Sequence, residues 1–243
     1  MKLVETKDSK YLYPEKSPLS SGQIELKYMT AKDEDILTSQ NLIAKGVVLD
    51  VLLDNLIVDK KIKVSDLLIG DKNALLIAAR VLAYGKQYEF EVTSPVTGEP
   101  TTHNLDLTSL KDISIDFSKM TKGQNEFEFT LPTTDRVIKY KLLTSGDVDA
   151  IERHAKSLSK VSDIDRTLTT RLKHMIVEVD GNSEQSVVNN FVDNEFFAVD
   201  SRSFRSYISD NTPDIDLEIS IDVDGEEVDI TVPMTVQFFW PSS

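Results

Sequence analysis

The sequence of 243 residues contains no cysteine. Disulfides, thiolate nucleophiles, cysteine zinc knuckles and iron–sulfur clusters are therefore excluded as properties of this chain. Histidine is also scarce, since His103, His154 and His174 are the only three, and their spacing matches no short metal-binding motif. We expect neither a metal ion nor another cofactor, and we interpret the three histidines as structural side chains.

Basic residues and long apolar runs are also lacking. The 27 Lys and Arg residues stand against 41 Asp and Glu, which gives a formal net charge of -14. Binding to nucleic acid needs a basic stripe, and the nearest candidates, residues 60–63 and 166–174, are short and flanked by Asp. No apolar run approaches the roughly 18 to 20 residues that span a bilayer, and the first residues do not have the pattern of a signal peptide. We therefore expect a protein made in the cytoplasm, with no nucleic-acid or membrane partner.

Motifs of known catalytic sites are missing as well. The sequence has no GxSxG or supported SxxK motif, and residues 69–73 contain Gly and Lys without the spacing of a phosphate-binding loop. Acidic pairs such as Asp222 and Asp224 arise by chance among 41 acids, and this stretch lacks the spaced ligands of a calcium-binding loop. The sequence therefore predicts no catalytic residues and a protein that is not an enzyme.

The patterns that are present predict an α+β fold, in which helical segments are combined with several antiparallel β-hairpins. The hydrophobic content of 40% is sufficient for a substantial core. Changes of period divide the chain into five regions: an extended N-terminal arm (1–22), a strand plus helical region (23–85), a β-hairpin region (86–143), a helical region (144–212) and a C-terminal β-hairpin with an aromatic tail (213–243).

The C-terminal hairpin has the clearest local pattern. Apolar residues alternate with polar ones from Ile215 to Val223 and again from Val228 to Val232. Asp224 and Gly225 lie between the two runs, and this dipeptide is typical of a tight hairpin turn. A helix is predicted after residues 64–71, with an apolar stripe that ends at Gly85.

Aromatic side chains near both ends are the candidate partner-binding residues. They are Tyr11, Tyr13, Phe238, Phe239 and Trp240. Aromatics dominate the buried centres of protein interfaces, and the arm before residue 23 has so little apolar content that we expect it to become ordered only on a partner. The alternative, which the sequence leaves open, is that the tyrosines pack on their own domain. In the same way the tail, as a last strand, would close the protein's own core and leave only Phe239 outward.

An ordered set of short motifs resembles a known family. In chain order the motifs are YMTAKDEDILTS at residues 28–39, GVVLD at 46–50, DLLIGDKNA at 66–74, AAR at 78–80, YG at 84–85 and FFWP at 238–241. This set resembles the T-even-type baseplate hub assembly proteins of contractile-tailed phages, over roughly residues 23–241. The specificity lies in the order of the motifs, since no single one would distinguish the family.

The resemblance implies a structural or assembly component of the baseplate hub of a contractile phage tail, which acts by binding other baseplate and hub proteins. Its location would be the virion tail baseplate, assembled in the host cytoplasm, and a homo-oligomer within the baseplate stays open. Many relatives carry CPxCG-like knuckles in two hairpins, whereas the matching residues 93–98 and 223–225 contain no Cys. Two alternatives remain, namely an envelope-degrading hydrolase associated with the hub and an assembly chaperone absent from the finished virion.

Overall fold

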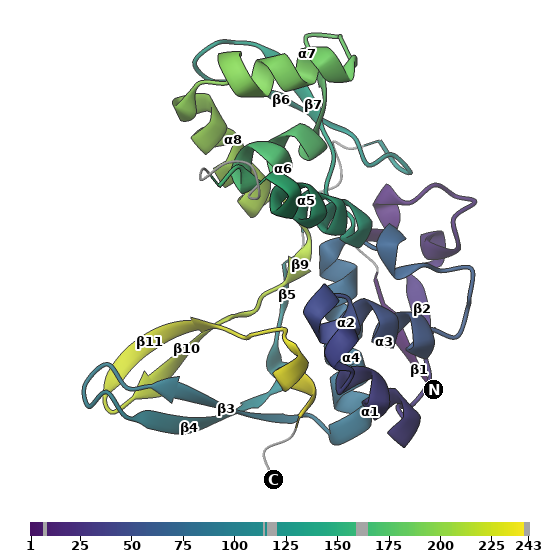
Figure 1. Ribbon diagram of the computed structural model, residues 1–243, viewed down its shortest axis with the longest axis vertical. Helices are drawn as coiled ribbons and strands as arrows, with labels where there is room; N and C mark the ends of the chain where they lie inside the picture. The colour runs from purple at the N-terminus through teal and green to yellow at the C-terminus, as the bar shows by residue number, and fades with distance from the viewer. Residues whose placement is uncertain (7–8, 114, 116–120, 159–164, 241–243) are drawn as a thin grey trace.

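The computed structural model describes residues 1–6, 9–113, 115, 121–158 and 165–240. Helices are combined with small antiparallel sheets, which confirms the predicted α+β class. Figure 1 shows three parts, namely an N-terminal body, a helical lobe above it and a pair of β-hairpins that project to one side. Pro241 and the two residues after it, at the end of the predicted aromatic tail, lie outside the described residues.

The N-terminal body is built around one long helix. It comprises β1 (Lys2–Glu5), β2 (Gln23–Leu26), α1 (Ala31–Leu37), α2 (Gln40–Lys45), α3 (Val48–Leu56) and α4 (Ile69–Tyr84). The predicted apolar stripe lies on α4, where Leu75, Leu76 and Ala79 are buried. The helix ends at Gly85, whose φ of 85° lies in the region that glycine adopts at little cost.

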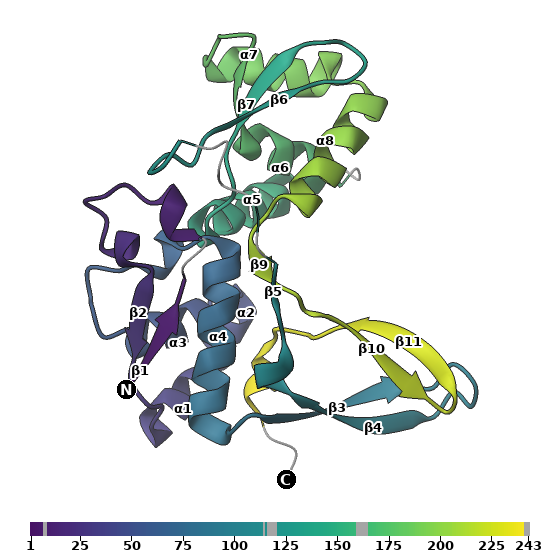
Figure 2. The ribbon, with the colours of Figure 1, turned by 180° about the vertical axis from the view of Figure 1, so that it is seen from behind.

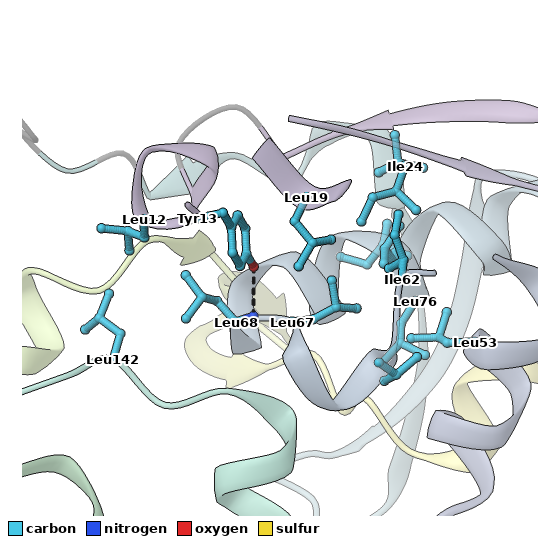
Figure 3. Close-up of a cluster of buried hydrophobic side chains, with 14 of the residues drawn as sticks. Leu12, Tyr13, Leu19, Ile24, Leu53, Ile62, Leu67, Leu68, Leu76 and Leu142 are labelled. Carbon is cyan, nitrogen blue, oxygen red and sulfur yellow. Dashed lines mark hydrogen bonds between the residues drawn. The ribbon is translucent and has the colours of Figure 1, made fainter. Parts of the chain in front are cut away.

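The N-terminal residues do not form the extended arm that the sequence predicts. β1 pairs antiparallel with β2, and two 3-10 turns, Ser9–Leu12 and Pro18–Ser21, lie between these strands. Figure 3 shows Leu12, Tyr13 and Leu19 packed over Leu67 and Leu68. The prediction of a loose arm was wrong because these three apolar residues are spread over separate turns, so they bury well without producing any period.

The helical lobe contains a three-stranded sheet with helices around it. The strands are β6 (Phe127–Thr130), β7 (Val137–Tyr140) and β8 (Ile176–Val179), and the helices are α5 (Ser145–Leu158), α6 (Thr167–Met175), α7 (Gln185–Asn190) and α8 (Ala198–Asp210). An aromatic cluster joins the sheet to α8, since the ring centroid of Phe204 lies 5.5 Å from that of Phe129 and 5.3 Å from that of Tyr140. Asp200 on α8 accepts hydrogen bonds from the Thr133 backbone nitrogen and the Thr134 hydroxyl in the turn between β6 and β7.

A short ladder connects the helical lobe to the parts below it. β5 (Asp112–Ile113) pairs with β9 (Asp214–Ile215), and β9 crosses against α4. Figure 2 shows this crossing from behind. Gly70 permits the close approach, because a side chain at this position would collide with the Pro213 carbonyl.

The hairpin arm consists of two β-hairpins, β3 (Gln87–Thr93) with β4 (Pro100–Asp106) and β10 (Glu218–Val223) with β11 (Glu226–Thr231). Asp224 and Gly225 have φ angles of 55° and 89°, and a tight turn of this kind requires positive values at both of its central residues. The predicted C-terminal hairpin is thereby confirmed. The first apolar run is interrupted, however, because Ile215 belongs to β9 and pairs with Asp112.

Candidate interaction sites

The two candidate tyrosines at the N-terminal end differ in accessibility. Tyr13 is buried, and its hydroxyl donates to the Asp71 carboxylate at 2.6 Å and accepts from the Leu68 backbone nitrogen at 3.1 Å. Burial, with the negative charge of Asp71 acting in the same direction, raises the pKa of Tyr13 far above its usual range. Tyr11 is 43% exposed, and its ring faces the Lys122 ammonium group at 6.0 Å. Tyr11 is therefore the member of the pair whose side chain is exposed at the surface.

The aromatic tail ends in a 3-10 turn, Val236–Phe239, instead of a last strand. Phe238 and Phe239 are both fully buried, so the structure places them in the protein's own core. If the tail closed the protein's own core as a last strand, we expected Phe239 to face outward, and this expectation was wrong. In a strand, successive side chains point to opposite faces, whereas in a 3-10 turn they lie about 120° apart, so two neighbouring side chains can both be buried.

A buried arginine holds the tail in place. Arg80 on α4 is only 1% exposed, and within the described residues it forms no ion pair with a carboxylate. Its Nε donates to the Phe238 carbonyl at 2.9 Å, and its two terminal nitrogens donate to the Gly85 and Gln87 carbonyls at 3.1 and 3.3 Å. Burial lowers the Arg80 pKa from its usual value, but an arginine remains charged at any physiological pH. One guanidinium thus ties α4, the start of the hairpin arm and the tail together.

Trp240 follows the buried turn and is 39% exposed. Its backbone nitrogen donates to the Gln237 carbonyl at 3.0 Å, so its position is fixed by the turn. Among the five aromatic candidates, the structure therefore leaves Tyr11 and Trp240 on the surface and buries Tyr13, Phe238 and Phe239.

The tips of the two hairpins meet at a polar junction that the sequence did not predict. Ser94 is buried, its hydroxyl donates to the Asp224 carboxylate at 2.6 Å, and it accepts from the backbone nitrogens of Val96 and Thr97. These residues belong to the two stretches that the family resemblance had matched to knuckles. In this chain a hydrogen-bonded serine and aspartate join the two tips.

Two of the three histidines lie close together in the structure, whereas the third lies apart from them. His103 lies on β4, where its ring stacks on Phe90 with the centroids 6.0 Å apart. His154 on α5 and His174 on α6 line one pocket, although their spacing in the sequence does not predict that they lie close together. Among the described residues, no group of three or more His, Asp or Glu residues is placed to hold a metal ion. Within the same residues, no helix has the length and apolarity required to cross a membrane.

Comparisons with known proteins place the chain in a family. The family model for the T4 bacteriophage base plate protein matches residues 10–240, which include the helical lobe, the hairpin arm and all of the N-terminal body except β1 and the residues next to it. Searches of curated proteins and of solved structures found no match.

Proposed function

The chain belongs to the family of T4 bacteriophage base plate proteins and is a structural component of a phage baseplate, and on this basis we propose that it acts in the hub by binding other tail proteins. The observation that carries the proposal is the extent of the family match, which covers nearly the whole chain. The match contains residues from all three parts of the fold, so we assign the proposed role to the whole described chain and not to one part of it. Its location is the tail baseplate of the virion.

Two exposed aromatic residues support a role in binding. Tyr11 and Trp240 retain 43% and 39% of their surface, while the aromatics beside them in the sequence are buried. Truncation of an aromatic at the centre of an interface costs roughly 2 kcal/mol or more of binding free energy. We propose that Tyr11 and Trp240 contact neighbouring baseplate or hub proteins, and that Tyr13, Phe238 and Phe239 support these contacts from the core.

The hub assignment is tested by chemical crosslinking of infected cells, followed by mass spectrometry of purified tails. We expect the chain to be present in finished virions and crosslinked to proteins of the central baseplate. Crosslinks confined to peripheral proteins would contradict the hub role. Detection in cell extracts, together with absence from virions, would indicate the assembly chaperone instead.

The binding residues are tested by the incorporation of variants into tails. Tyr11→Ala and Trp240→Ala are expected to reduce incorporation at least tenfold while leaving the melting temperature unchanged. Matched controls are Tyr28→Ala and Phe197→Ala, since both residues are exposed aromatics outside the candidate set. Equal incorporation of all four variants would contradict the assignment of Tyr11 and Trp240.

A further inference from the structure

The helical lobe contains a pocket whose charged lining is basic, although the chain as a whole is acidic. The pocket has a volume of about 430 Å³ and lies among α5, α6, β8 and α7. Its charged and titratable lining consists of Lys141, His154, Lys173 and His174. No Asp or Glu is among the described residues that line it. We call this cavity the histidine pocket.

Each of the two lysines forms an ion pair with an aspartate that does not line the pocket. The Lys141 ammonium group contacts the Asp147 carboxylate at 2.7 Å, and the Lys173 ammonium group contacts the Asp193 carboxylate at 2.6 Å. An ammonium group has three N–H donors, so each lysine keeps donors for another acceptor after its ion pair is formed. The aspartates thus hold the lysines in position without occupying the cavity.

Amide and hydroxyl groups also line the pocket, together with the apolar residues Ile176 and Val177. Gln185 and Asn189 lie one turn apart on α7, and the Gln185 amide nitrogen donates to the Asn189 amide oxygen at 3.1 Å. This contact leaves the Asn189 amide nitrogen as a donor. Thr170, which is buried, also contributes to the wall. The pocket is therefore rich in hydrogen-bond donors of both charged and neutral kinds.

The electrostatic balance of the pocket depends on the histidines. Burial lowers the pKa of His174; Asp147 opposes this effect, whereas the neighbouring Lys141 and His154 reinforce it. The charged groups around the imidazole are thus Asp147 and His154 on α5 and Lys141 after β7, together with the paired Lys173 and Asp193. Because each lysine already has an aspartate partner, protonation of His174 adds a positive charge that no ion pair in the lining balances.

We propose that the histidine pocket binds a carboxylate group supplied by a partner protein, either an acidic side chain or a chain terminus. The charges of the two lysines are balanced by their aspartate partners, so the extra positive charge in the pocket comes from imidazolium. Such a small positive charge suits a ligand with a single negative charge. A polyanion such as nucleic acid would be repelled by the net charge of -14 on the chain. Binding strengthens as the pH falls through the pKa of His174. The identity of the partner as a tail protein rests on the proposed function.

Proton resonances of the imidazole rings provide a direct test on the full chain. Titration is repeated with acetate, succinate and inorganic phosphate as probes. We expect acetate and succinate to raise the pKa of His174 by about one pH unit, equivalent to tenfold tighter binding of the protonated form. Lys173→Gln should abolish this response, and His103, on the hairpin arm, should not respond. An unchanged His174 pKa, or an equal response of His103, would overturn the site, and preferential binding of phosphate would overturn its assignment to carboxylate.

A second measurement separates the pocket from the baseplate role. Two variants are compared for their incorporation into tails. One is the double variant His174→Gln/Lys173→Gln, and the other is the control variant His103→Gln. A deficit confined to the pocket variant would support a partner carboxylate. Normal incorporation of a variant that no longer responds to acetate would overturn the partner, although the proposed function would stand. Absence of even the wild-type chain from virions would refute the proposed function, whereas the titration would still decide whether the pocket binds carboxylates.

Discussion

Replacement of Arg80 by Met tests whether the buried guanidinium stabilises the fold. The substitution keeps an unbranched side chain of similar length and removes all the donors. Three carbonyl groups then lose a partner, those of Phe238, Gly85 and Gln87. The Phe238 carbonyl is buried with the arginine, whereas the other two contacts are partly buried, so water replaces the arginine there more easily.

The expected loss follows from these three contacts. An unsatisfied buried carbonyl costs about 1 to 3 kcal/mol, and each partly buried bond contributes about 1 kcal/mol. Removal of a buried charge returns part of its desolvation cost, which lowers the total. We expect Arg80→Met to reduce the free energy of unfolding by about 3 kcal/mol. For a chain of this size this corresponds to a fall in melting temperature of roughly 6 to 12 °C.

Urea unfolding followed by circular dichroism measures the effect. Arg80→Lys keeps the charge but replaces a planar fork by a compact ammonium group, so it should recover only part of the loss. Arg202→Met is the matched control, because Arg202 is exposed on α8. If Arg80→Met unfolds within about 0.5 kcal/mol of the wild type, the ordinary range for a surface change, the guanidinium gains no more from the carbonyls than its burial costs.

The remaining predictions concern the tail, a buried acid, the hairpin tips and metal content. Deletion of residues 237–243 removes two fully buried Phe side chains, each worth about 3 to 5 kcal/mol, so we expect an unfolded or insoluble product; a soluble, cooperatively folded one would contradict the burial. Although burial opposes it, hydrogen bonding from the Thr133 backbone and the Thr134 hydroxyl lowers the pKa of Asp200, so its contribution to stability is present above the unfolded pKa and lost as the pH falls below about 4. Asp200→Asn should flatten this acid dependence in urea unfolding, and an unchanged slope would count against it. Ser94→Ala should speed hydrogen exchange at both hairpin tips, whereas the exposed Ser220→Ala on the same arm should not. Elemental analysis of the purified protein should find no stoichiometric zinc, and about one tightly held ion per chain would disprove this.

Local patterns were sufficient for elements whose stabilising contacts are close in sequence. The hairpin β10–β11 follows from strict alternation on either side of Asp224 and Gly225, and its pairs join residues between 3 (Val223 with Glu226) and 13 (Glu218 with Thr231) positions apart. Helix α4 follows from its apolar stripe and the glycine that ends it. In both cases the residues that determine the element are also the residues within it.

The contacts that build the candidate sites are long-range, and no local period encodes them. The junction of Ser94 with Asp224 spans 130 positions. His154 and His174 share a pocket only because α5 packs against α6. The tail shows the same limit, since alternation favoured a strand while the geometry around Arg80 favours a turn that buries both Phe238 and Phe239. Tertiary packing, which depends on all the elements together, decided these cases.

The hydrogen bond from Arg80 to the Phe238 carbonyl also sets an order of events during translation, because it joins residues 158 positions apart. At about 5 to 20 residues per second, the ribosome adds Phe238 roughly 8 to 30 seconds after Arg80. Over this interval the nascent N-terminal body lacks the two phenylalanines that fill its core, and the apolar surface they cover remains open to other nascent chains. A ribosome that stalls before residue 236 releases a product that cannot complete this core. Synthesis of residues 236–239 therefore acts as a checkpoint for folding, because a chain without them lacks two fully buried side chains of its core.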